Sequence, residues 1–419
     1  MPRMSRYDVL IIGAGAAGLF AARALRSVRT AVVDHNAVPG RKLAIAGGGM
    51  GNVTNRVLSA DRYVGDTGIL KNLLRRHDCA AMLSVLESFG IPYEEREFGQ
   101  IFCLVRASAL AEALREASGA DLFLGTAIKA CFYTAVSGQA PGRPKDGPAD
   151  GAGPVFEYHV RLANGYEIHA PNMIVATGSC ACPRVGASGF GLALAARWGH
   201  AVVPFSPVLV PFVMPPGWLL SGLEGISLPA RIIVRRPDGT QFRDPEGIRS
   251  LLITHRGLSG PAALVASCFW RPGDVLSIDF LPDFPLAELL DAPGSGKKTL
   301  KTCVASRLPE RLAAALLPED LKERKTAELS RRDRLRAAGS VHAFEAVPAG
   351  TEGFGKAEAA AGGVLLSGLD TAFQSRAFPG LYFCGEVVNI TGLLGGYNIH
   401  FAFASAECAA ARILRSFGR

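Results

Sequence analysis

The chain has 419 residues, 49% of them apolar and 20% charged, and its formal net charge is +8. This length and composition are typical of a globular protein with two or three domains, and they exclude a disordered or fibrous chain. The longest uncharged stretch, 201–223, is interrupted by five prolines, so we expect no membrane-spanning helix. The N-terminus lacks the apolar core of a secretory signal, which predicts a cytoplasmic protein.

The first informative segment is a glycine motif between two short apolar runs. The run at 9–12 has no helical periodicity and predicts a strand buried on both faces. It leads into Gly13-x-Gly15-x-x-Gly18 and a helical pattern, and a second β run ends on Asp34. This order predicts a dinucleotide site. Gly13 permits a tight turn, Gly15 permits the approach of a pyrophosphate, and Gly18 permits helix–sheet packing. Asp34 is placed to bind a ribose, and the helix N-terminus to bind phosphate. A glycine-rich turn without a ligand is the alternative.

The next elements extend this first domain. Helical periodicity appears at 69–89 and 108–117, and a β meander covers 122–169. A Pro/Gly/Asp-rich stretch at 137–153 interrupts the meander and predicts a surface loop. The meander leads to a buried strand at 173–178, which ends on a glycine.

The middle of the chain, 196–344, has a different pattern. Residues 228–235 and 275–280 are predicted strands, and 286–336 is predicted to be mostly helical. The run at 321–336 mixes basic and acidic residues, which favours a solvated helix face over a nucleic-acid patch. Nucleic acid is therefore an unfavoured partner at this point.

The last part of the chain returns to the order strand, glycine, helix. A buried strand ends on Gly385-Glu386, and Gly395-Gly396 precede an apolar helix. Nucleotide-type segments at both ends predict an α/β fold with a discontinuous domain and an insertion. We assign 1–195 and 345–419 to a Rossmann-like domain, 196–275 and 337–344 to a β-rich inserted domain, and 276–336 to a small helical domain.

The meander before the 173–178 strand and the final Gly-Glu strand resemble flavoproteins of the glutathione-reductase type. This resemblance implies FAD as the resident cofactor, with the N-terminus of the last helix directed at the pyrimidine edge of the flavin. Such an arrangement is physically reasonable, because a positive helix end stabilises the negative charge of reduced flavin.

Four ordered blocks make the resemblance more specific. They are RKLAIAGGGMGNVTN at 41–55, THRGLSGP at 254–261, FPGLYFCGE at 378–386 and GGYN at 395–398. These blocks are similar to those of one flavoprotein family, which includes aminoacetone oxidases and the enone reductases of bacterial bile-acid dehydroxylation. The resemblance covers nearly the whole chain and implies an FAD-dependent oxidoreductase.

Carried over residue by residue, the resemblance implies that segments from both ends of the chain line FAD. The implied residues are Gly13, Gly15, Ala16, Ala17, Gly18, Asp34, His35, Arg41, Lys42, Gly48, Gly49, Asn52, Ala176, Thr177, Gly178, Gly385, Glu386, Gly395, Gly396, Tyr397 and Asn398. Ile128 is expected to add backbone contacts on the adenine side.

The chain departs from the family pattern at several positions near the implied flavin. Met50-Gly51 replaces Arg-Cys, and the other departures are Cys182 for Tyr, Phe190 for Asp, Asn389 for an acid and His400 for Gln. These changes imply a re-equipped flavin face, so the family's known substrates need not transfer to this chain.

Three residues are candidates for proton transfer. Neutral histidine moves protons near pH 7, which singles out His400, close to the start of the last helix, and His255, before a Gly-Leu-Ser-Gly-Pro turn. Tyr397 is a candidate proton donor or carbonyl ligand. For each of the three residues, a purely structural role is the alternative.

Nine cysteines form no Cys-x-x-Cys pair and no Cys/His group with zinc spacing. Their scatter through a large chain predicts reduced thiols and no bound metal. Cys180-x-Cys182 has the wrong spacing for a redox dithiol, because a one-residue disulfide loop is strained.

The leading prediction is an FAD-dependent oxidoreductase that acts on a small or medium apolar molecule. The family resemblance implies that NAD(P)H reduces FAD and that the flavin then reduces a conjugated C=C. The absence of a second Gly-x-Gly-x-x-Gly implies that NAD(P)H binds transiently. One alternative is an oxidase that takes hydride from an amine or C–H substrate and passes electrons to O₂. A more distant alternative is a flavin-containing, RNA-associated protein. Nothing in the sequence indicates the oligomeric state.

Overall fold

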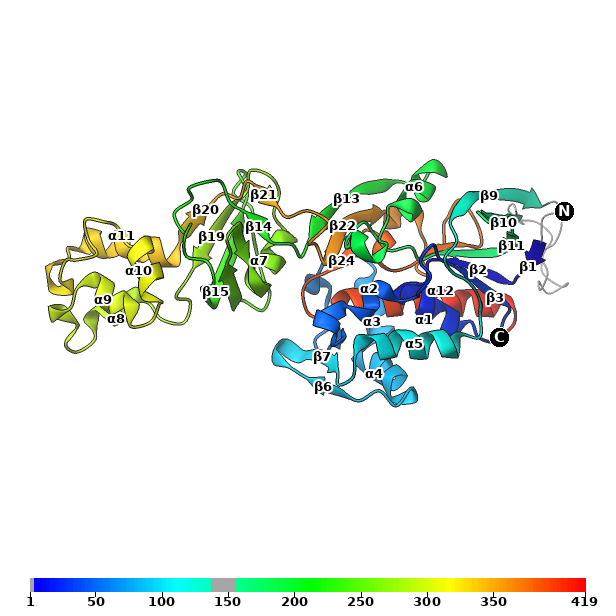
Figure 1. Cartoon of the computed structure of the whole chain (residues 1–419), viewed down its shortest axis with the longest axis horizontal. Helices are drawn as coiled ribbons and strands as arrows, with labels where there is room; N and C mark the ends of the chain where they lie inside the picture. Colours follow the sequence, from blue (N-terminus) through cyan, green and yellow to red (C-terminus); the bar gives the residue numbers. More distant parts are fainter. Residues whose placement is uncertain (1–3, 137–154) are drawn as a thin grey trace. The chain divides into compact units, whose positions relative to one another are not determined.

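The computed structural model describes residues 4–136 and 155–419, and it divides the chain into two compact units (Figure 1). Unit 1 combines Met1–Ser206 with Ala359–Arg419, and unit 2 is Pro207–Glu358. Both chain crossings, after Ser206 and after Glu358, therefore lie farther along the sequence than our proposed junctions at 195 and 345. The loop predicted at 137–153 lies outside the described residues.

A five-stranded parallel sheet, in the order β23-β12-β2-β3-β8, forms the centre of unit 1. Its strands are β2 (Val9–Ile12), β3 (Thr30–Val33), β8 (Asp121–Phe123), β12 (Asn172–Val175) and β23 (Leu381–Phe383). Four of them, β2, β3, β12 and β23, are buried along their whole length, as expected for a parallel sheet covered on both faces. This topology confirms the predicted Rossmann-like α/β fold.

Three helices pack together beside this sheet. Helix α1 (Ala16–Ala24) connects β2 to β3 and contacts both α5 (Ala107–Ser118) and α12 (Tyr397–Ser416) (Figure 1). Small residues allow the close packing, because Ala17 and Ala21 of α1 and Ala402, Ala406 and Ala409 of α12 are all buried. The first and last helical segments of the chain are thereby joined into one domain.

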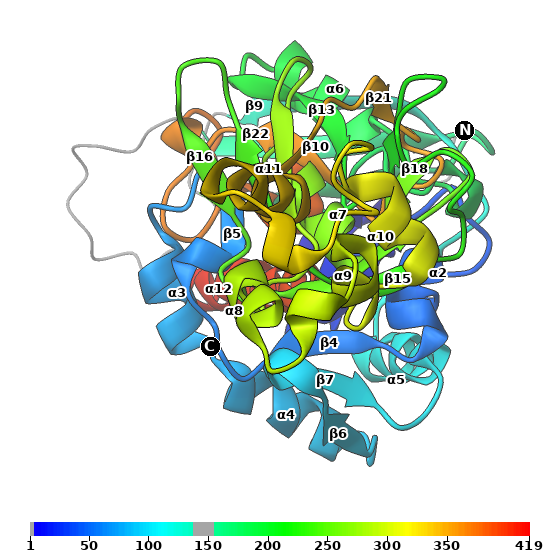
Figure 2. The same ribbon diagram turned by 90° about the vertical axis from the view of Figure 1, so that its left-hand side faces the viewer.

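Smaller sheets complete unit 1. Strands β1 (Met4–Arg6), β11 (Glu167–Ala170), β10 (Val155–Leu162) and β9 (Ile128–Val136) form a four-stranded sheet in that order. A three-stranded sheet has the order β4 (Asn52–Asn55), β7 (Gln100–Cys103), β6 (Tyr93–Glu95). In two further pairs, β5 (Tyr63–Gly65) bonds to β24 (Ile390–Gly392), and β13 (Val202–Val208) bonds to β22 (Ala359–Val364). The remaining helices are α2 (Arg41–Ala44), α3 (Leu70–Arg76), α4 (Cys79–Ser88) and α6 (Phe190–Arg197). Figure 2 shows α4 and α5 grouped with β6 and β7.

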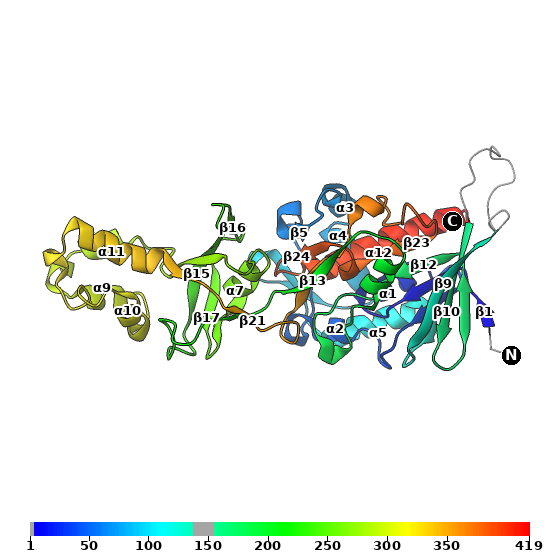
Figure 3. The ribbon, with the colours of Figure 1, turned by 90° about the horizontal axis from the view of Figure 1, so that it is seen from above.

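Unit 2 combines a largely antiparallel sheet with helices. Its strands are β14 (Phe212–Val213), β15 (Ser227–Arg235), β16 (Gln241–Arg243), β17 (Arg249–Ile253), β18 (Gly257–Ser259), β19 (Val275–Asp279), β20 (Phe344–Ala346) and β21 (Gly350–Thr351). Its helices are α7 (Gly260–Ser267), α8 (Leu286–Asp291), α9 (Leu300–Ala305), α10 (Glu310–Leu316) and α11 (Arg331–His342). Helices α8 to α11 gather at one end of the unit (Figure 3). One hydrophobic cluster includes residues of both parts, such as Leu251 and Leu312, so we treat their division into two domains as a proposal.

The described residues, 4–136 and 155–419, contain no helix that is both long and apolar enough to cross a membrane.

Candidate functional site

The ends of the parallel strands bring the predicted nucleotide segments together. Ile12 of β2 is in register with Val33 of β3 and with Val175 of β12, and Val175 is in register with Phe383 of β23. The residues that follow these strands therefore emerge along one edge of the sheet. In open α/β sheets, ligands bind at this carboxyl edge.

The three glycines of the motif have different surroundings. Gly13 has φ +105° and lies so close to β12 that a Cβ would be 2.4 Å from the Ala176 carbonyl oxygen. A Cβ on Gly18 would be 1.8 Å from the Gly13 carbonyl oxygen, which confirms that this glycine is needed for helix–strand packing. A Cβ on Gly15, however, would meet no atom within 4 Å. Gly15 thus faces open space at the N-terminus of α1, where unpaired helix N–H groups attract an anion.

Asp34 lies beside this loop. Its Oδ2 accepts a hydrogen bond of 2.7 Å from the Ala14 N–H, and its Oδ1 accepts one of 2.7 Å from the Asn36 N–H. The exposed His35 imidazole is 3.6 Å from Oδ1. The Asp34 carbonyl accepts from the Thr126 N–H at 3.3 Å, so the segment leading to Ile128 runs alongside the acid. This arrangement supports the proposed ribose and adenine contacts.

A second group of predicted residues joins α2 to the Gly-Glu turn. The Lys42 ammonium donates to Glu386 Oε2 at 2.7 Å, and the other Glu386 oxygen accepts from the Ala360 N–H at 2.9 Å. A Cβ on Gly178 would be 3.9 Å from Glu386 Oε2. Lys42, Gly178 and Glu386 are therefore close together, although they are far apart in the sequence. Arg41 lies nearby and donates to Asn36 Oδ1 at 2.9 Å.

The start of α12 is packed tightly against β4. A Cβ on Gly396, which has φ +89°, would be 2.5 Å from the Thr54 carbonyl oxygen and 2.7 Å from Asn52 Oδ1. The Asn398 side chain exchanges two hydrogen bonds of 2.8 Å with the backbone of Gly392. Asn398 therefore shapes the turn before the helix, and we propose that only its backbone remains for FAD.

The surroundings of His400 argue against a catalytic acid–base role, which stays a prediction. Its side chain is fully buried, Nε2 donates to the His77 carbonyl at 2.7 Å, and Nδ1 accepts from the Thr54 hydroxyl at 2.8 Å. Burial lowers the pKa of His400 from 6.5 to about 4. A neutral imidazole with both nitrogens occupied joins α12 to β4 and to the end of α3, and this supports a positioning role.

The other two proton-transfer candidates stay predictions. Tyr397 is 1% exposed, and its ring packs edge-on against Tyr63 with centroids 5.7 Å apart. His255 is exposed in the turn between β17 and β18, where the Thr254 hydroxyl accepts the Gly257 N–H at 3.1 Å. His255 belongs to unit 2, whereas the nucleotide segments belong to unit 1.

The structure explains one of the departures from the family pattern. Gly51 has φ +66°, and a Cβ there would be 3.2 Å from the Ala107 Cβ, so the backbone favours glycine at this position. Met50 is 37% exposed.

None of the nine cysteines, all within the described residues, forms a disulfide. Burial, followed by the nearby Glu386 charge, raises the pKa of Cys180, which argues against a reactive thiolate.

Sequence reasoning missed the role of Thr54 and Asn55. Thr54 contacts His400, and the Asn55 amide donates to the carbonyl oxygens of Phe98 and Gly395 at 3.0 and 3.1 Å. The Asn-x-Thr-Asn and Gly-Gly-Tyr-Asn blocks are therefore bonded to each other. Their occurrence in the same family pattern was the only sequence signal for this contact.

The surroundings of this edge fit FAD. Cβ atoms on Gly15 and Gly48 would point into open space. A bound dinucleotide would fill this space. The class of protein that this fold and site define is an FAD-dependent oxidoreductase.

The comparisons with known proteins name the family. Residues 7–137 match the Rossmann domain of HI0933-like proteins, and residues 206–359 match the HI0933-like protein barrel and H2TH domain. The chain therefore belongs to the HI0933-like family.

Three relatives are similar over nearly the whole chain. The ribosomal RNA dihydrouridine synthase of Escherichia coli is 32% identical, covering 97% of this chain and 98% of the relative. That of Haemophilus influenzae is 33% identical, covering 98% and 100%. The 3-dehydro-bile acid Δ4,6-reductase of Clostridium scindens is 27% identical, covering 95% and 97%. The resemblance to bile-acid reductases is confirmed, and the resemblance to aminoacetone oxidases stays a prediction. The sequence pattern disfavoured nucleic acid as a partner. The two ribosomal RNA dihydrouridine synthases among the relatives give that expectation no support.

Proposed function

We propose that this protein reduces the C5=C6 double bond of a uracil base in RNA, with NAD(P)H as the source of electrons. The observation that carries the proposal is the 32–33% identity, over almost the full length, to two enzymes named ribosomal RNA dihydrouridine synthases. Bound flavin would supply the hydride. The protein would hold the base in place and supply a proton.

The chemistry joins this proposal to the enone reduction expected from the sequence. The C5=C6 bond of uracil is conjugated with its C4 carbonyl, so the base is itself an unsaturated carbonyl compound. Hydride adds to C6, a proton adds to C5, and NAD(P)H is oxidised to NAD(P)⁺. The same electron flow reduces a conjugated ketone, which accounts for a bile-acid reductase among the relatives.

A direct assay separates the candidate functions. Holoprotein is incubated without oxygen with NADPH or NADH and with either unmodified ribosomal RNA transcripts or a conjugated ketosteroid. We expect nucleosides that have gained two hydrogens, detected by mass spectrometry after RNA digestion. Reduction of the ketosteroid alone would replace this proposal with the second candidate, an apolar-enone reductase. Hydrogen peroxide formed in air from an amine substrate without NAD(P)H would instead favour the oxidase alternative.

Three lysines of unit 2 are suited to an RNA backbone. Lys297 and Lys298, at the end of η5 (Ser295–Lys297), are exposed, as is Lys325 before η6 (Thr326–Glu328). The Thr326 N–H donates to the Lys298 carbonyl at 3.0 Å, so the two segments are adjacent. None of the three lysines forms an ion pair with a described residue. We refer to Lys297, Lys298 and Lys325 as the lysine cluster.

Replacing the lysine cluster with alanine is expected to weaken RNA binding and its salt dependence. Each lost phosphate contact reduces the slope of log K against log[salt] by about 0.7–0.9, so the slope should fall by roughly 2. Fluorescence anisotropy with a labelled transcript at several salt concentrations measures this slope. The matched control replaces Lys301 and Lys322, which pair with Glu323 and Glu319. Equal slopes for the triple variant and the wild type would exclude the lysine cluster as an RNA contact.

A further inference from the structure

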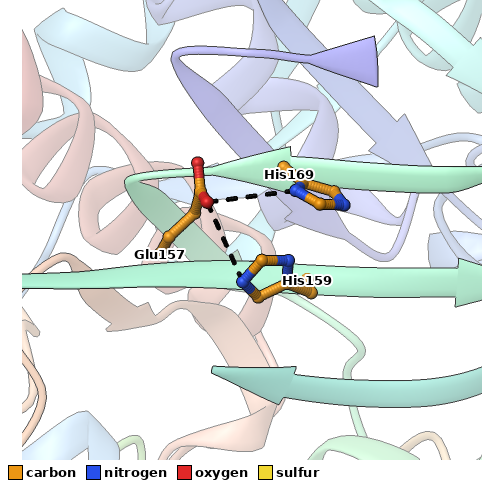
Figure 4. A group of neighbouring side chains, drawn as sticks. All are labelled: Glu157, His159 and His169. Carbon is orange, nitrogen blue, oxygen red and sulfur yellow. Dashed lines mark ion pairs between the residues drawn. The ribbon is translucent and has the colours of Figure 1, made fainter. Parts of the chain in front are cut away.

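Three side chains outside the nucleotide edge converge on one face of the four-stranded sheet of unit 1. Glu157 and His159 are two residues apart on β10, so they point to the same side. His169 of β11 is directly opposite His159 in the antiparallel register. Figure 4 shows both imidazoles turned toward the Glu157 carboxylate. Strand pairing thus assembles a His-His-Glu group that the sequence spacing conceals.

The distances within this group are too long for direct hydrogen bonds. Glu157 Oε2 is 3.9 Å from His159 Nε2 and 3.9 Å from His169 Nδ1, whereas hydrogen bonds of this kind span about 2.7–3.2 Å. One ligand atom from each residue lies within 4.8 Å of the other two. All three side chains are at least four-fifths buried. The polar atoms therefore surround a point without contacting each other.

We propose that Glu157, His159 and His169 bind a divalent transition-metal ion, with Zn²⁺ as the best fit. Two imidazole nitrogens and one carboxylate oxygen form a donor set that zinc accepts, with a water in the fourth position. Tetrahedral zinc with bonds of about 2.0–2.1 Å separates its ligand atoms by roughly 3.3 Å. The group therefore needs only to contract inward, without a change of backbone register.

Neighbouring residues hold the three ligands in this orientation. Arg6 donates to Glu157 Oε1 at 3.0 Å through Nε, which leaves Oε2 facing the imidazoles. Glu167 Oε1 is 3.5 Å from His169 Nε2, on the side of the ring away from Glu157. A carboxylate behind a ligating histidine is the usual outer partner in metal sites. Phe132 stacks on His159, with centroids 4.7 Å apart and planes 4° from parallel.

One existing contact opposes metal binding. The Thr134 hydroxyl is 2.8 Å from His159 Nε2, and this hydrogen bond is lost when the nitrogen binds an ion. The buried nitrogens His159 Nδ1 and His169 Nε2 have no hydrogen-bond partner in the described part of the chain. Because its ligands come from both strands, the ion would join β10 to β11. This structural role does not depend on the proposed RNA reduction.

The test uses untagged holoprotein, freed of metal with a chelator and titrated with Zn²⁺ alone by calorimetry. We expect one equivalent to bind and the Tm to rise with Zn²⁺. His159→Ala and His169→Ala should each weaken binding at least tenfold, and Glu167→Gln, which removes only the outer carboxylate, about tenfold. The matched control is Glu94→Gln, which alters a carboxylate paired with Arg96 on another sheet and should bind Zn²⁺ normally.

Two results would overturn the proposal. One is a wild-type protein that binds no Zn²⁺ in the micromolar range, which would leave an ordinary water between these groups. The other is unchanged Zn²⁺ binding in His169→Gln, a variant of similar volume that serves if the alanine variants fail to fold. Flavin content and RNA reduction are recorded in parallel, because their loss alone would concern the proposed function and not the metal.

Discussion

Gly15→Val is expected to give a folded protein that has lost its FAD. A Cβ at this position would meet no protein atom within 4 Å, and Gly15 has φ −79°, which any residue adopts. The added side chain therefore leaves the fold intact but fills the space in front of the α1 N-terminus, where the pyrophosphate is proposed to bind. We expect the flavin content of the purified protein, measured from its visible absorption, to fall by more than an order of magnitude.

Two other glycines provide the comparison. Gly68→Val is the matched control, because Gly68 is exposed, has no atom within 4 Å of a Cβ and lies outside the nucleotide segments. It should retain FAD fully. Gly18→Val should instead fail to fold, because its Cβ would be 1.8 Å from the Gly13 carbonyl oxygen. A yellow Gly15→Val protein with normal FAD content would refute the proposed phosphate loop.

His400→Ala is expected to destabilise the protein by about 3 kcal/mol at pH 7. The substitution leaves the Thr54 hydroxyl and the His77 carbonyl without their partner, and each unsatisfied buried group costs about 1–3 kcal/mol. His400→Gln, which restores the usual family residue, should lose much less because an amide both donates and accepts. Chemical denaturation of the two variants and the wild type measures the difference.

The pH dependence of stability provides a second test of His400. In the unfolded chain its pKa is near 6.5, whereas burial lowers the pKa to about 4 in the folded protein. Between these values only the unfolded state binds the proton, so the free energy of unfolding falls as pH decreases from 6.5 to 4. The contribution is about 3 kcal/mol, and it should be absent from His400→Gln.

The comparison with His400→Gln is needed because other histidines act in the same direction. Burial lowers the pKa of His77 and His200 as well, so the wild-type curve alone does not isolate His400. A glutamine variant that is stable but inactive, with the wild-type pH dependence of stability retained, would restore the catalytic interpretation. Unchanged turnover with a flatter pH profile would confirm a positioning role.

The sequence by itself determined the elements whose physics is local. A buried apolar run, a glycine turn and a small-residue helix specify β2, Gly13, Gly15, Gly18 and α1, because each needs only its chain neighbours or the adjacent strand. The strand–glycine–helix segments near both termini also indicated that one domain is built from both ends of the chain. These features account for the fold class and the cofactor.

Only the tertiary structure decided which polar side chains meet. His400 lies on the buried side of α12 because β4 and α3 cover that face, and no sequence pattern states which residues will cover a helix. Likewise, Glu157, His159 and His169 come together through the register of β10 and β11, which is set by hydrogen bonding between strands. Local patterns encode backbone conformation, whereas burial and partners depend on segments that are distant along the chain.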